Sequence, residues 1–360
     1  MISLPANNHS FTAKITDHPV PTATAKKTVT NPMTELRSRL SKVGVKRKFL
    51  NEVVLPEWWE DSIALTAGGF REATAYICAH LGFSLKSLLN PKENLTFSHQ
   101  GAVKYKKAKG VTADEVCLAT HLALGVARAV ATAFSEKPAC SPVPAPKAWR
   151  DDLLAKSDRP WVCLRHILNA TWELGIPVIH LRCVPTTTKK PDALTTMVGN
   201  RPVIVILNGR KSPSWIAFIV AHELGHIHRK HLKPGQTLVD EKIDSQSEEK
   251  EEVEANDFAA ILLTGTSDLG LRSSSSLGCA QLASQAKIFG KKYRIAPGVA
   301  ALNYGFTTGL WAVANGAVAQ LEKQDDAGHD LKKALDAHLD PDDMSEESWE
   351  WIARATSAGA

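Results

Sequence analysis

The residues that could carry chemistry are gathered in one short segment, His222-Glu223-Leu224-Gly225-His226. Residues i and i+4 lie on one face of a helix, so the two imidazoles can bind the same metal ion. Glu223 lies one position further round, where its carboxylate can reach a water on that ion but is turned away from binding it. Zinc lowers the pKa of a bound water, and a neighbouring carboxylate can take the proton from that water. The segment therefore predicts a zinc hydrolase with Glu223 as general base.

A catalytic zinc ion needs a third protein ligand and an open position. His228 and His231 lie at the wrong helical angle to share the metal, and we interpret them as surface cations near the end of the helix. The next source of a ligand is the acidic segment 248–263, which has the pattern of a second helix. On this helix Glu252 shares an apolar face and is favoured as the ligand, with Glu254 as the alternative.

Asn256 follows Glu252 by one helical turn, so we expect its side chain to orient one of the ligands by a hydrogen bond. The oxyanion stabiliser is left open among Tyr293, Tyr304 and several histidines. Cys279 follows a serine-rich loop and is interpreted as a buried thiol rather than a nucleophile.

The elements that must position these residues have recognisable boundaries. Ser212 and Pro213 have the residue types of a helix cap and first helical position, so a helix should begin there. Residues 193–198 and 202–207 flank Gly199-Asn200 and predict a hairpin, after a helix at 149–174 and a strand at 176–181. We expect the second hairpin strand to form the sheet edge near the metal and to pair with a peptide substrate through Val203, Ile204, Val205 and Ile206.

The remainder of the chain divides into segments of different composition. Residues 1–32 predict a disordered leader, 33–134 a helical domain, 135–148 a proline-rich linker, 149–321 the metal-binding domain, and 322–360 an acidic, solvated helical tail. Within the helical domain, Cys78, Gly82 and Ser84 are spaced like the turn of a degenerate helix-turn-helix. The basic N-terminal half, including the lysines of 104–109, makes DNA a possible partner. The fold class expected is α+β.

Composition excludes several classes of protein. The chain has 360 residues, 44% of them hydrophobic and 22% charged, which is an ordinary globular balance and unlike a disordered chain or a rod. The six cysteines are dispersed without a CxxC pair, which fits a reducing cytoplasm rather than a disulfide scaffold. The most apolar stretch, 116–134, contains His121 and Arg128, so we expect no membrane span, and the N-terminus lacks a signal-peptide pattern.

Two motifs together resemble the ImmA/IrrE metallopeptidases. That family has His-Glu-Leu-Gly-His on one helix, as at 222–226, and then a Glu, an Asn four residues later, Phe-Ala and a Leu pair, as at 252–263. Segments 172–179, 201–206 and 295–299 are also similar, so the resemblance spans roughly residues 149–310. One departure is Leu263-Thr264-Gly265, where the family usually has Leu-Met-Pro.

The resemblance implies a compact gluzincin-like zinc peptidase fold, often joined to a helix-turn-helix. It places the metal ligands at His222, His226 and Glu252, with one zinc ion per chain, and the general base at Glu223. It also implies an enzyme of stress response or of phage and mobile-element regulation, whose substrate is a regulatory protein such as a transcriptional repressor. Because the cysteines are dispersed, we expect this enzyme in the cytoplasm. The alternative is a DNA-binding or antitoxin-like regulator in which the metal site is structural or vestigial.

Overall fold

The structure is a computed structural model that describes residues 31–98, 103–106, 113–134, 140–185, 188–240, 249–271 and 277–357. It confirms the α+β fold class, with N-terminal helices followed by a mixed sheet and the helices that carry the expected ligands. The expected leader lies almost entirely outside the described residues, as do parts of the linker and the lysines beyond Lys106, and those expectations stay predictions.

The elements run along the chain as follows. The helices are α1 (Pro32–Lys42), α2 (Arg47–Phe49), a π-helical turn (Leu50–Val54), a short 3-10 helix (Ile63–Leu65), α3 (Ala67–Leu81), α4 (Leu85–Leu89), α5 (Ala113–Ala133), α6 (Pro146–Lys156), α7 (Leu164–Glu173), α8 (Pro213–His228), α9 (Lys250–Thr264), α10 (Cys279–Tyr293), α11 (Pro297–Thr308), α12 (Trp311–Leu321), α13 (Ala327–His338), a second 3-10 helix (Pro341–Asp343) and α14 (Glu346–Thr356). The strands are β1 (Val103–Lys106), β2 (Val178–His180), β3 (Ala193–Val198), β4 (Arg201–Ile206) and β5 (Thr237–Asp240).

The five strands form one sheet in the order β1-β5-β3-β4-β2. The hairpin of β3 and β4 is confirmed, and Gly199 takes the positive φ of 60° that its turn requires. The expected edge strand is wrong, because β4 pairs with β3 on one side and with β2 on the other. Residues Val203, Ile204, Val205 and Ile206 are completely buried, which is typical of an interior strand, and they offer no free edge to a peptide.

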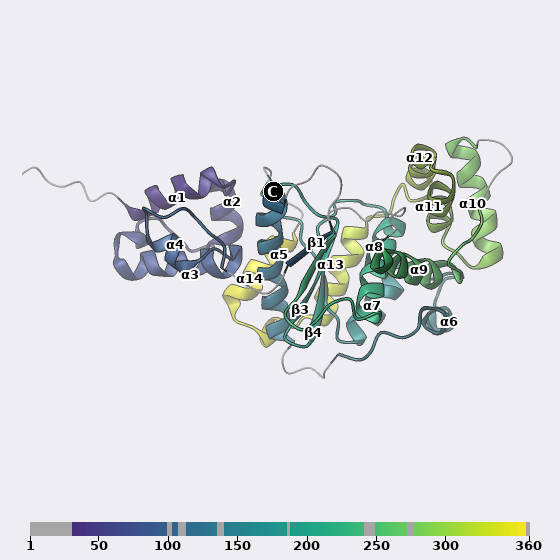
Figure 1. Ribbon diagram of the computed structural model, residues 1–360, viewed down its shortest axis with the longest axis horizontal. Helices are drawn as coiled ribbons and strands as arrows, with labels where there is room; N and C mark the ends of the chain where they lie inside the picture. The colour runs from purple at the N-terminus through teal and green to yellow at the C-terminus, as the bar shows by residue number, and fades with distance from the viewer. Residues whose placement is uncertain are drawn as a thin grey trace, which may run out of the picture.

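Helices lie on both sides of this sheet and continue away from it at each end (Figure 1). The group α1–α4 lies at one end of the molecule, and α10–α12 lie at the other, beyond α8 and α9. The single helix expected over 149–174 is wrong: α6 ends at Lys156 and α7 begins at Leu164. Pro160 lies between them and cannot continue a helix, because it lacks the N–H that the helical hydrogen bond needs.

The residues of the expected helix-turn-helix turn lie in the last turn of α3 and between α3 and α4. Gly82 ends α3 with a φ of 72°, and a side chain there would contact His121 on α5 at 3.0 Å. The following helix, α4, has only five residues, so it is much shorter than a helix that crosses a DNA groove. DNA binding by this part of the chain stays a prediction.

Packing continues across the expected domain boundaries. β1, from the N-terminal half, pairs in parallel with β5, and Lys104 forms an ion pair of 2.5 Å with Glu251 at the start of α9. α5 packs on β3 and β4. The segment Val116–Ala133 of α5 is long and apolar enough to cross a membrane, judged by length and composition alone. Most of this segment is buried inside the protein.

The C-terminal segment is helical, as expected, but it is packed against the rest of the protein, which corrects the expectation that this acidic tail is solvated. α14 buries Trp351 and Ile352, and Arg354 donates a hydrogen bond of 2.6 Å to the carbonyl oxygen of Leu55. The Trp351 ring stacks on the His80 ring of α3 with centroids 3.8 Å apart. The acidic residues lie on the other face of this amphipathic helix, and the apolar face joins the N-terminal helices to α5.

Candidate metal centre

The helix that carries the predicted ligands begins where its sequence indicates. The Ser212 side chain accepts a hydrogen bond from the Trp215 N–H, and Pro213 occupies the first turn of α8. The Glu322 carboxylate, just after α12, accepts hydrogen bonds from the hydroxyls of Ser212 and Ser214. Burial raises the pKa of Glu322, and these hydrogen bonds oppose the rise. The N-terminus of α8 is thereby anchored to the C-terminal helices.

Close contact between α8 and α9 brings the ligands from the two helices together. Gly225 lies between the two histidines, and a Cβ at this position would stand 2.8 Å from the Cα of Ala255. Only glycine permits the two backbones to approach this closely. Figure 1 shows α8 and α9 as neighbouring helices. Their contact places Glu252 of α9 opposite His222 and His226 of α8.

Four buried side chains meet at this contact, namely His222, His226, Asp240 and Glu252. The two histidine Nε2 atoms are 3.0 Å apart, and the Glu252 carboxylate oxygens lie 3.4 and 3.5 Å from them. Asp240 Oδ2 lies 3.8 and 3.9 Å from the same two nitrogens. A tetrahedral ion with ligand distances of about 2.0–2.2 Å would separate its donor atoms by about 3.3–3.6 Å. The four donors therefore fit around one metal ion, and the predicted ligands His222, His226 and Glu252 are all among them.

Asp240 was missed by sequence reasoning. It is the last residue of β5, so it belongs to neither of the two helices that the motifs mark. The signal in the sequence is limited to three residues with high strand propensity, Thr237–Val239, followed by an aspartate. Its place beside the histidines depends on the pairing of β5 with β3, which is a long-range contact.

Glu223, the predicted general base, lies against this group and is completely buried. Its Oε2 accepts a hydrogen bond of 2.5 Å from the Thr195 hydroxyl on β3, and among the described residues no hydrogen-bond donor reaches Oε1. Burial raises the pKa of Glu223 well above its ordinary value, and the charge of Asp240 raises it further. One oxygen is thus held by the protein and the other remains available to accept a proton.

The residues around the ligands separate Glu252 from its alternative. Asn256 Oδ1 lies 3.0 Å from His222 Nδ1, which is the orienting contact expected for it. Glu254 is outside the donor group, and its carboxylate instead lies 3.0 Å from His231 Nε2. His231 was expected to be a surface cation, but its ring is largely buried and its Nδ1 lies 2.8 Å from His226 Nδ1.

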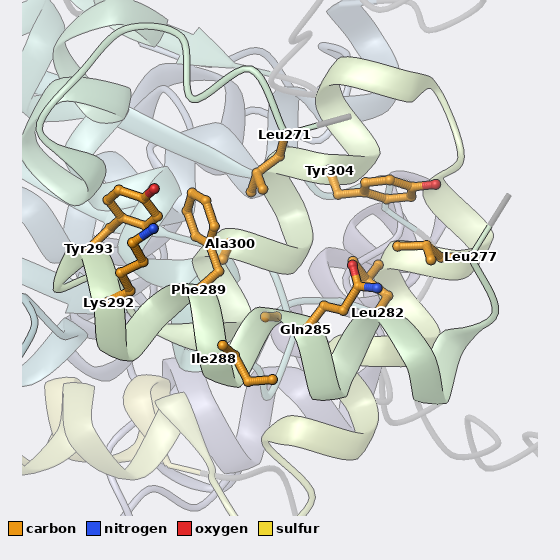
Figure 2. Close-up of a pocket in the computed structure, with 11 residues that line it drawn as sticks. Leu271, Leu277, Leu282, Gln285, Ile288, Phe289, Lys292, Tyr293, Ala300 and Tyr304 are labelled. Carbon is orange, nitrogen blue, oxygen red and sulfur yellow. The ribbon is translucent and has the colours of Figure 1, made fainter. Parts of the chain in front are cut away.

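Other residues considered from the sequence lie elsewhere. Tyr293 and Tyr304, the oxyanion candidates, line an apolar pocket of about 280 Å³ between α10 and α11 (Figure 2), and none of the metal-group residues lines it. Cys279 is half-buried at the start of α10, close to Gly316 of α12. His228 contacts the Val143 carbonyl oxygen at 2.8 Å and so takes no part in the donor group.

Comparison with known proteins agrees with this geometry. Residues 172–282 match the IrrE N-terminal-like domain, Peptidase_M78. This range contains β2 to β5 and both ligand-bearing helices, which are the elements that build the donor group. No curated protein sequence matches the chain. Within residues 172–282, then, the chain carries an IrrE N-terminal-like domain of the Peptidase_M78 family whose metal-binding group is intact, and that combination implies a metallopeptidase.

Proposed function

We propose that the domain is a zinc-dependent endopeptidase that cleaves a regulatory protein, such as a transcriptional repressor, in the cytoplasm. The observation that carries the proposal is the buried carboxylate of Glu223 beside a donor group of metal-binding size. The donors are two imidazoles and two carboxylates, a set that suits zinc. We assign one ion per chain to His222, His226 and Glu252. The kind of substrate is taken from the family resemblance.

The reaction divides its tasks among a few side chains. A bound zinc ion would act as a Lewis acid on the peptide carbonyl and would acidify the attacking water. Glu223 accepts the proton of that water at Oε1 and passes it to the leaving amine. Thr195 donates its hydroxyl to Oε2 and so fixes the orientation of this carboxylate. Asn256 orients His222 through Nδ1, which leaves Nε2 for the metal.

One observation favours the alternative of a regulator with a structural metal. Asp240 supplies a fourth protein donor, and structural zinc sites are typically closed by four protein ligands. A structural site, however, has no use for the base Glu223, which the protein buries at this position. The two readings differ in what happens when that carboxylate is replaced.

The test is Glu223→Gln, which keeps the size of the side chain and removes the base. The variant should retain its metal and lose about 10²–10⁴ in rate, the usual contribution of general acid–base catalysis. The full chain is co-expressed with each genomic neighbour, and the abundance of every neighbour is compared between wild type and variant. Glu249→Gln, an exposed change at the start of α9, is the control.

The proposal expects one neighbour to disappear with wild type and with Glu249→Gln but to persist, bound and uncut, with Glu223→Gln. If every neighbour behaves identically with wild type and Glu223→Gln while both proteins contain zinc, the peptidase proposal is wrong and the regulator is favoured.

A further inference from the structure

Beyond the donor group, a chain of side-chain contacts leads from His226 toward the surface. His226 Nδ1 lies 2.8 Å from His231 Nδ1, and His231 Nε2 lies 3.0 Å from Glu254 Oε2. The exposed side-chain fraction increases along the chain, from 0% for His226 to 9% for His231 and 29% for Glu254. The contacts therefore connect a fully buried ligand with a carboxylate that reaches solvent.

The backbone at the end of α8 creates this arrangement. The helix ends at His228, and Lys230 adopts a left-handed conformation with a φ of 59°. This conformation is uncommon for a residue with a side chain. It returns the chain so that the His231 N–H donates a hydrogen bond of 3.0 Å to the His226 carbonyl oxygen. His231 consequently lies beside His226, which a continued helix would not allow.

The hydrogen-bonding capacity of the rings permits one arrangement of protons when a metal is bound. If His226 binds the ion through Nε2, its proton must be on Nδ1, and that N–H donates to His231 Nδ1. A neutral His231 that accepts at Nδ1 carries its proton on Nε2, and this N–H donates to Glu254. Every donor then has an acceptor, and the Nε2 lone pair of His226 faces the metal.

We propose that His231 and Glu254 are positioning residues for the metal, and that they hold His226 in the orientation and tautomer that bind it. The proposal deepens the proposed function, since it requires the metal centre but no particular substrate. In this arrangement each histidine ligand donates a hydrogen bond from Nδ1. His222 donates to Asn256, and His226 donates to the His231–Glu254 pair. Hydrogen-bond partners of this kind typically change metal affinity by about 10–100-fold.

The test compares metal affinity in matched variants of the full chain. His231→Phe keeps a ring but cannot accept the hydrogen bond, whereas His231→Asn keeps an acceptor near the position of Nδ1. His228→Phe is the control, because it makes the same change at the same helix end and outside the chain of contacts. Zinc affinity is measured by competition with a chromophoric chelator, and circular dichroism of the metal-free proteins reports their fold.

We expect His231→Phe to bind zinc about 10–100-fold more weakly, His228→Phe to stay within about twofold of wild type, and His231→Asn to recover much of the loss. Glu254→Leu should weaken binding too, and the double variant His231→Phe/Glu254→Leu should be no weaker than His231→Phe alone.

Equal affinities for His231→Phe and His228→Phe, or additive losses in the double variant, would overturn the positioning role. A wild-type chain that binds no zinc would instead refute the metal centre of the proposed function. If His231→Phe does not fold, the comparison of His231→Asn with wild type decides, since a loss of about 10-fold or more in His231→Asn, which keeps the acceptor, would contradict the proposal.

Discussion

The contact between His80 and Trp351 should make the attachment of α14 sensitive to acid. The His80 ring is buried between α3 and α14, and its Nδ1 lies 2.7 Å from the Val54 carbonyl oxygen. The pKa of His80 is lowered from 6.5 to about 4: burial lowers it most, the hydrogen bond to Val54 opposes part of that effect, and the nearby cation of Arg354 adds a smaller decrease. Protonation would place a positive charge in an apolar contact.

The size and sign of the effect follow from this shift. Between pH 6.5 and about 4 the unfolded chain binds a proton at His80 that the folded chain excludes. The free energy of unfolding therefore keeps its full value above pH 6.5 and decreases as pH falls toward 4. At about 1.4 kcal/mol per pKa unit, the loss amounts to about 3 kcal/mol at pH 4. His80→Phe keeps a ring for Trp351 and removes the titrating nitrogen.

The assay is urea unfolding of wild type and His80→Phe at pH 7 and pH 4. The variant lacks the hydrogen bond to Val54 and should be the less stable protein at pH 7. The difference in free energy of unfolding between the two proteins should decrease by about 3 kcal/mol at pH 4, because only wild type is destabilised by protonation of His80. A difference that is the same at both pH values, or a His80 ring that titrates near 6.5 by NMR in the folded protein, would refute the argument.

Two further predictions concern the metal centre. Gly225→Ala should destabilise the protein by about 1–3 kcal/mol and weaken zinc binding, because its Cβ would meet backbone atoms of Ala255 that cannot move aside; Gly209→Ala, where the space is open, should change neither the melting temperature nor the zinc content. Asp240→Asn should keep about one zinc per chain by metal analysis, since three protein ligands suffice for a catalytic site. A metal-free Asp240→Asn protein would indicate a closed structural site.

The parts of the site that could be predicted are those encoded within one helix or one turn. The spacing of His222 and His226 puts both on one face of α8, and the cap at Ser212 correctly marks where that helix begins. The same reasoning separated Glu252 from Glu254, because only Glu252 shares the buried face of α9. Local periodicity carries this information without knowledge of the tertiary fold.

The parts that could not be predicted depend on long-range contacts or on a single backbone angle. Asp240 reaches the donor group only because β5 pairs with β3. β4 is an interior strand because β2 pairs with it, and β2 precedes the β3–β4 hairpin in the sequence. His231 was misjudged because helical angles were extended past His228, whereas Lys230 turns the chain back. None of these features has a periodic signal in the sequence.

The donor group is therefore a property of the assembled domain rather than of its motif. Two ligands lie on α8, a third on α9, and Asp240 on β5, so their separations of 3.0–3.9 Å require the helix contact at Gly225 and the strand pairing at the same time. An unfolded chain has no such arrangement, and a metal that binds only the assembled form adds its binding free energy to folding. Metal binding and the stability of this α8–α9–β5 contact should consequently change together, whereas the His80–Trp351 contact, made by α3 and α14, should respond to acid whether or not metal is bound.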